Sequence, residues 1–128
     1  MSTAAAQSEI TPAEPSIQIH HFKEKILEKE VNFFVIKMSD SFILWIGQTE
    51  PCLGNLAVAM RTKFGPDAVG SSLFGDSSDP TCMTISQQLA KSTGKQVFVS
   101  YNLQPDLMLI QLVEKRISRE IKSNPGCF

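Results

Sequence analysis

Apolar residues along this chain gather in short runs separated by polar and turn-forming stretches, and most of these runs have the composition of β-strands. The clearest are residues 31–38 and 42–47, which are rich in β-branched and aromatic side chains. Asp40-Ser41 lies between them as a short polar turn, so together they predict a β-hairpin. Weaker strand signals are found at residues 17–22, 56–60, 71–74 and 96–103, the first of them suited to a sheet edge.

Two segments in the second half of the chain carry helix signals instead. Asp79-Pro80 is a favourable helix start and Gly94 a favourable helix end, which together predict a helix over residues 80–93. A second helix is predicted from Pro105 to about residue 123, because apolar residues recur there every three or four positions. The charged residues of this second helix, Glu120 among them, are expected to face water.

The order of these elements predicts the fold class. Five or six strands, mostly connected by hairpins, with one helix before the last strand and one after it, are typical of an α+β domain. We expect a six-stranded antiparallel sheet with two helices on one face. Residues 1–16 are small or polar and predict a flexible tail. Residues 17–128 are then a single domain, since a chain of 128 residues supports one core.

Both faces of the predicted sheet are apolar, whereas an antiparallel sheet with one wet face alternates apolar and polar residues. Two helices cover about one face, because each covers a strip roughly 10 Å wide. A monomer would leave more apolar surface exposed than soluble proteins tolerate, so we expect a second protein chain to cover the other face. Burial by the chain's own loops or N-terminal segment, and an apolar ligand cavity, stay open as alternatives. The candidate interface residues are Phe34, Ile36, Met38, Phe42, Leu44 and Ile46.

Composition narrows the function classes further. The chain has 12 Lys and Arg against 13 Asp and Glu, so it lacks the basic excess typical of nucleic-acid binders. Its three cysteines are too far apart in sequence for paired metal half-sites, and no cofactor or metal is expected. The first residues lack the basic start and apolar run of a secretory signal, and no apolar run reaches the length of a membrane span. We therefore expect a cytoplasmic protein, with the nucleus as a second location.

One stretch resembles a catalytic motif. Gly75-Asp76-Ser77-Ser78 is superficially similar to the nucleophile turn of a hydrolase, with Ser77 as the nucleophile. A serine nucleophile needs a histidine base, and the chain offers only His20 and His21, which are adjacent on one predicted strand and so point to opposite faces. A loop that ends in a helix cap is the favoured interpretation, and a small hydrolase stays an alternative.

Several segments, in one collinear order over residues 17–128, resemble the proteasome assembly chaperone 4 family. They are Leu44–Gly47, Asn55–Met60, Ser72–Asp79, Lys95–Leu103, Leu112–Glu114, Arg116-Ile117 and the C-terminal Phe128. The resemblance implies a non-catalytic chaperone that forms a heterodimer with proteasome assembly chaperone 3 and promotes assembly of the α-ring of the 20S proteasome. A homodimer is an expected state of the isolated chain.

The resemblance leaves the contact with the proteasome open. Loop and helix-end residues are the candidates for contact with the α-subunits, because a polar contact allows the chaperone to leave. They are Asp76, Asp79, Arg116 and Arg119. Other proteasome chaperones and activators dock through a tail with a penultimate tyrosine. This chain has Cys127 at that position, so this docking mode is not expected.

Overall fold

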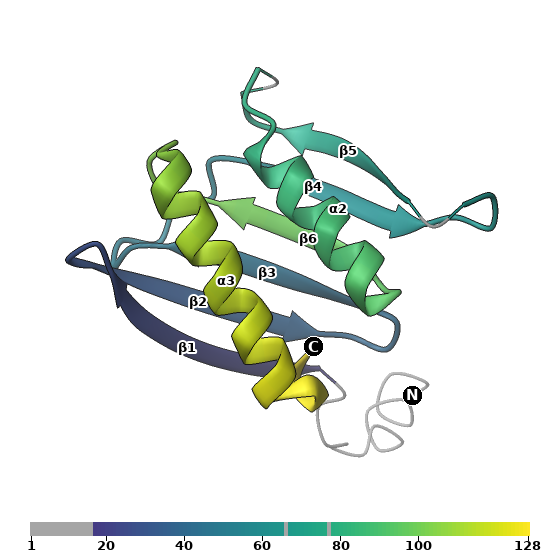
Figure 1. Cartoon of the computed structure of the whole chain (residues 1–128), viewed down its shortest axis with the longest axis horizontal. Coiled ribbons are helices and arrows are strands. Elements are labelled where there is room, and N and C mark those ends of the chain that lie inside the picture. Colours follow the sequence, from purple (N-terminus) through teal and green to yellow (C-terminus); the bar gives the residue numbers. More distant parts are fainter. Residues whose placement is uncertain (1–16, 66, 77) are drawn as a thin grey trace, which may run out of the picture.

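Six strands and two α-helices make up the part of the chain that the computed structural model describes, residues 17–65, 67–76 and 78–128 (Figure 1). The predicted tail, residues 1–16, lies outside these described residues. The strands are β1 (Gln18–Ile26), β2 (Lys29–Lys37), β3 (Ser41–Gly47), β4 (Leu56–Arg61), β5 (Ala68–Phe74) and β6 (Gln96–Tyr101). The helices are α2 (Thr81–Thr93) and α3 (Leu107–Ser123), followed by the 3-10 turn η1 (Pro125–Cys127).

The first strand is longer than its sequence signal. It continues to Ile26 because Phe22 and Ile26 are both buried against the core, four residues apart on the same face. Leu27 and Glu28, with φ of 50° and 66°, then form the two-residue turn to β2. Two consecutive left-handed residues are the geometry of a type I′ turn, whose twist matches that of the flanking strands.

The strand order is β1-β2-β3-β6-β4-β5, which makes the sheet mixed and not purely antiparallel. The prediction of six strands and two helices in an α+β fold is confirmed, but the prediction of an antiparallel sheet is wrong at one place. β3 and β6 pair in parallel, whereas the other neighbouring strands pair antiparallel. The reason is the crossover through α2, which carries the chain from edge strand β5 to the middle of the sheet, so that β6 runs in the same direction as β5. There β6 lies between β4, to which it is antiparallel, and β3, to which it is parallel.

Both helices lie on one face of the sheet (Figure 1). α2 packs over β4, β5 and β6, and α3 crosses the β1 side of the sheet. The core between helices and sheet is mainly apolar, with Ser86 of α2 as a buried polar residue. Its apolar members include Val31, Phe33, Val35, Phe42, Leu44, Ile46, Val97, Val99, Ile85, Val113 and Ile117. The C-terminal Phe128 adds an aromatic side chain to this core, with its ring centroid 5.6 Å from that of Phe42.

The end of α2 is as predicted, since Gly94 ends the helix in the left-handed conformation with φ of 73°. Its start is one residue later than predicted: Pro80, not Asp79, is the N-cap, and the Asp79 carboxylate accepts a hydrogen bond from the Thr81 backbone N–H at 3.0 Å just before the helix. α3 begins two residues later than predicted, because Asp106 caps it by accepting a hydrogen bond from the Met108 N–H.

Glu120 is buried, so the expectation that it faces water is wrong. Its carboxylate accepts hydrogen bonds from His20 Nε2 at 2.9 Å, from Arg116 at 2.7 Å and from Asn124 at 2.8 Å. Burial alone would raise the pKa of Glu120, but these three hydrogen bonds and the Arg116 charge hold the pKa below its ordinary value. The network fastens α3 to β1 at the edge of the sheet.

Candidate functional site

The face of the sheet opposite the two helices, called the open face below, carries an apolar row that crosses five strands. Strand register places each member of the row directly beside the next. Residues opposite each other on neighbouring strands have Cβ atoms about 5 Å apart, so the row is continuous. From β1 to β4 it contains Ile19, Ile36, Ile43, Phe98 and Val58.

An aromatic row lies next to the apolar one. The His21 ring stacks on Phe34 with centroids 4.2 Å apart, and Phe34 meets Trp45 edge to face at 5.8 Å. The Trp45 Nε1–H donates a hydrogen bond to the Cys52 carbonyl at 2.7 Å, which ties the loop after β3 to the sheet. A Cβ at Gly47 would lie 2.4 Å from the Trp45 ring, so glycine is required there for the indole to lie across the strand.

A hollow of about 750 Å³ lies between these rows and the loop after β3. Its lining is mostly apolar and includes Ile19, Phe34, Ile36, Ile43, Trp45 and Leu53. Leu53 is 58% exposed at its rim. A concave apolar surface of this size fits a large side chain from another protein, the geometry of an interface hot spot.

The apolar surface continues to the far edge of the sheet. Met60 on β4 and Val69 on β5 are direct neighbours, and both are about half exposed. Leu73 is exposed further along β5. Apolar residues therefore occur on the open face from β1 to β5, although Ser71 of β5 lies directly beside Val58. A charged group lies near the β1–β2 turn, where Lys23 pairs with Glu30 at 3.4 Å.

Comparison with known proteins gives the family. The model of the family "Proteasome assembly chaperone 4" matches residues 30–103. The mouse proteasome assembly chaperone 4 is 45% identical over 117 residues, which cover 91% of this chain and 94% of the mouse protein. The human proteasome assembly chaperone 4 is 43% identical over 120 residues, which cover 93% of this chain and 97% of the human protein. The chain belongs to the proteasome assembly chaperone 4 family.

A solved structure has the same fold. It is a chain from the crystal structure of a chaperone complex for yeast 20S proteasome assembly, with a TM-score of 0.60 at 12% identity. The match covers 82% of this chain and 96% of that chain. The resemblance found in the sequence is thus confirmed, and the family is one of assembly chaperones and not of enzymes.

The candidate interface residues of this family member divide between the two faces. Phe34 and Ile36 lie on the open face, and Met38 lies just beyond the end of β2, half-buried. Phe42, Leu44 and Ile46 are fully buried beneath the helices, so their assignment to a surface is wrong. The register explains the error, because Phe34 pairs with Trp45 and Ile36 with Ile43, which leaves the intervening residues of β3 on the helix face. Sequence reasoning missed Ile43 and Trp45 for the same reason.

The four candidate contacts with the α-subunits do not lie together. Asp76 and Asp79 lie beside edge strand β5, whereas Arg116 and Arg119 lie on α3 above the opposite edge, β1. The Asp76 carboxylate accepts hydrogen bonds from the Ser78 hydroxyl and backbone N–H, which lower its pKa. Asp76 and Asp79 therefore organise the start of α2, and the two arginines belong to a separate surface.

The hydrolase alternative finds no support in the histidines. Ser77 itself lies outside the described residues. His20 is hydrogen-bonded to Glu120, and His21 is stacked on Phe34 with its Nε2 3.1 Å from the Asn32 side-chain oxygen. Both lie on β1, five strand spacings from β5, which is about 24 Å at 4.8 Å per spacing.

The described residues also offer no metal site, no membrane-spanning helix and no reactive thiol at Cys82. Within residues 17–65, 67–76 and 78–128, no three His, Cys, Asp or Glu side chains lie close enough to hold a metal ion. No helix in these ranges is long and apolar enough to cross a membrane. Cys82 is buried and its Sγ contacts Asn55, and burial raises the pKa of its thiol, which keeps it in the unreactive protonated form.

Proposed function

We propose that the open face binds a partner chaperone of the proteasome assembly chaperone 3 type, and that this heterodimer promotes assembly of the 20S proteasome α-ring. The observation that carries the proposal is the apolar row from Ile19 to Val58, which lies on the side of the sheet that the helices leave free. The relationship to proteasome assembly chaperones supports the role, and the neighbour from a chaperone complex supports pairing.

The size of the open face fits a stable interface. Six strands about 4.8 Å apart and about 20 Å long span on the order of 600 Å² before side-chain relief is counted. This flat area is about three-quarters of the roughly 800 Å² that each partner buries in a standard interface, and the relief of the side chains adds accessible area to it, so an interface of standard size needs the whole open face. The hollow beside Trp45 gives this surface a place for a large apolar anchor from the partner.

The experiment is a mass measurement on coexpressed chains. Phe34→Asp places a charge in the aromatic row of the open face, where Phe34 is 37% exposed, so the isolated chain should still fold. In the pair this charge would be buried without a partner, and light scattering should report separate subunits.

The matched control is Leu107→Asp, which places the same charge on a 77% exposed residue at the start of α3. This variant should keep the mass of the 1:1 pair. Loss of pairing in both variants, or in neither, would argue against the open face as the interface.

We also propose the cytoplasm as the working location, with the nucleus second. Cys52 is an exposed free thiol, and free thiols are typical of reducing compartments. Fractionation of cells that produce the tagged chain tests this location, and recovery in a secretory fraction would contradict it.

A further inference from the structure

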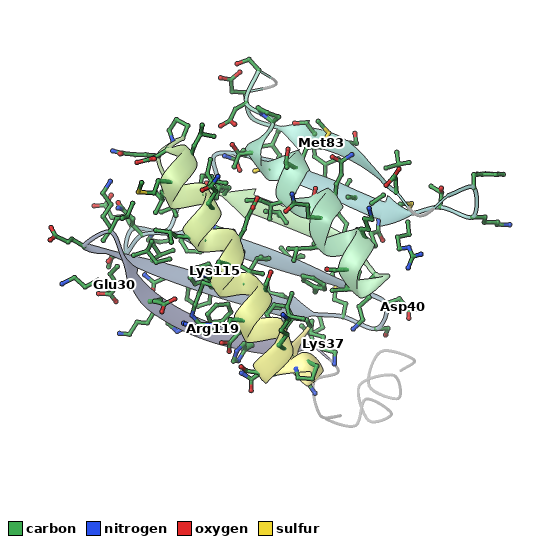
Figure 2. The ribbon with its side chains drawn as sticks, in the orientation of Figure 1. Glu30, Lys37, Asp40, Met83, Lys115 and Arg119 are labelled. Atoms are coloured by element: carbon green, nitrogen blue, oxygen red, sulfur yellow. The ribbon has the colours of Figure 1, made fainter. Side chains whose placement is uncertain are left out.

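A groove of about 580 Å³ runs between α3 and the end of the β1–β2 hairpin, on a different part of the molecule from the open-face hollow. Its wall on the helix side is a stripe at the spacing of three and four residues, in which Leu112 is followed by Lys115, Arg119 and Lys122. Figure 2 labels Lys115 and Arg119 along this part of α3. The other wall comes from the last residues of β1 and from Leu27 in the turn.

The groove is strongly basic in a chain that is nearly neutral overall. Five of the 12 Lys and Arg residues line it, and Glu24 is the one carboxylate in the lining. Glu24 is already engaged, since its oxygens lie 2.8 Å from Arg116 Nε and 2.7 Å from an Arg119 nitrogen. Among the described residues, no carboxylate lies within ion-pair distance of Lys25, Lys115 or Lys122.

The floor of the groove is fixed in position. Arg116 is held between Glu24 and the buried Glu120, and its guanidinium carbon lies 4.8 Å from the centre of the Phe22 ring. Leu27 and Leu112 remain 44% and 36% exposed beside it. The groove therefore combines apolar side chains on its two walls with three lysines that lack a carboxylate partner in the described part of the chain, and Arg116 is held in place between them by its two carboxylates.

The edge of the sheet adds a third feature. β1 is an edge strand, so one side of its backbone has no strand partner within the described part of the chain. An extended segment that lies along such an edge can pair with the free backbone groups while its side chains contact the neighbouring surface. Here the neighbouring surface is the basic stripe of α3.

We propose that this groove docks an extended acidic segment with apolar side chains, carried by the proteasome subunit that the chaperone pair receives. The identity of the carrier rests on the proposed function, whereas the acidic character of the ligand rests on the groove alone. Exposed charge pairs are individually weak and are screened by salt, so contact through this groove is easily reversed. That property suits a chaperone that must leave its client, in contrast to the apolar open face.

A peptide experiment tests the chemistry. The probe is a fluorescein-labelled ten-residue peptide of alternating Glu and Leu, and the matched probe has Gln in place of every Glu. Fluorescence anisotropy should show that the acidic peptide binds and that its affinity falls as salt rises. The double variant Lys115→Glu/Lys122→Glu should weaken binding by about tenfold or more. Equal binding of the two peptides, or unchanged binding by the variant, would overturn the proposal.

The control variant is Lys63→Glu/Lys91→Glu, which makes the same charge change at exposed sites outside the groove. It should bind the acidic peptide as the wild type does. Lys115→Gln/Lys122→Gln removes the charges without adding repulsion and should give an intermediate loss. Melting temperatures of all variants are measured first, so that a folding defect is separated from a binding defect.

An assembly experiment separates this inference from the proposed function. The Lys115→Glu/Lys122→Glu chain should form the heterodimer with normal mass but recover about tenfold less α-subunit from a mixture of purified subunits. Normal recovery of α-subunits by a normal heterodimer would overturn the role of the groove and leave the proposed function intact. Failure of the wild-type pair to recover any α-subunit would count against both.

Discussion

Alanine substitutions of the adjacent residues Ile43 and Leu44 test the two faces of the sheet separately, within a single strand. Leu44 is fully buried under the helices, whereas its neighbour Ile43 is half-buried in the apolar row of the open face. The two residues have similar size and apolar character. They therefore isolate the effect of position, and the account predicts opposite outcomes for folding and for pairing.

The magnitudes follow from burial. Leu44→Ala leaves a cavity in the core and should lower the free energy of unfolding by about 2–5 kcal/mol. Ile43→Ala removes a side chain that is partly wet in the isolated chain, so its unfolding free energy should fall by less than about 1.5 kcal/mol. The proposed pair would cover the same side chain completely. The dissociation constant should then rise by about 5-fold to 150-fold, which corresponds to roughly 1–3 kcal/mol.

Urea denaturation of the isolated chain and titration of the partner measure the two quantities. With a urea dependence of about 2 kcal/mol/M, Leu44→Ala should lower the midpoint by about 1–2.5 M, whereas Ile43→Ala should shift it by less than about 0.8 M. A Leu44→Ala chain as stable as the wild type would refute the assignment of the buried face. An Ile43→Ala chain with unchanged affinity for the partner would refute the assignment of the open face.

Three further predictions concern single residues. The stability that Glu120 contributes should be complete above its ordinary pKa of 4.5 and should disappear as pH falls through its lowered folded pKa. Thermal unfolding should therefore show that the stability advantage of the wild type over Glu120→Gln shrinks below about pH 4.5. Gly47→Ala should displace the Trp45 indole and shift its fluorescence emission; an unchanged spectrum would contradict the contact. Phe128→Ala should lower the free energy of unfolding by about 3 kcal/mol in urea, because its ring is 2% exposed in the core, and a loss below about 0.5 kcal/mol would argue against that packing.

The helices and the strand segments could be predicted from local signals, since Asp79, Gly94 and the β-branched runs act within a few residues of themselves. The face of the sheet on which each strand residue lies could not be predicted in this way. Alternation shows that Phe42, Leu44 and Ile46 share a face, but when both faces are apolar it does not show which one the helices cover. Strand register, which depends on long-range pairing, decides the question.

The same limit applies to charge and to strand order. From the sequence alone Glu120 is predicted to face solvent, because nothing local shows that β1 places His20 beside it. Its spacing of four residues from Arg116 was, however, a local sign of an ion pair. The distance between Asp76 and Arg119 depends on which strands form the edges of the sheet. The prediction that the first strand lies at a sheet edge is confirmed, whereas β5 carried no comparable sign, because an edge strand needs no particular composition on its buried side.

The central claim is that a partner chain covers the open face, and Trp45 reports on that face directly because it is the one tryptophan of the chain. The chain is labelled with 5-fluorotryptophan, and its ¹⁹F resonance is recorded alone and in a 1:1 complex whose mass has been verified. The account predicts that the resonance moves on pairing and loses most of its sensitivity to replacement of H₂O by D₂O. A complex of the correct mass in which the Trp45 resonance keeps its position and its solvent sensitivity would contradict the account.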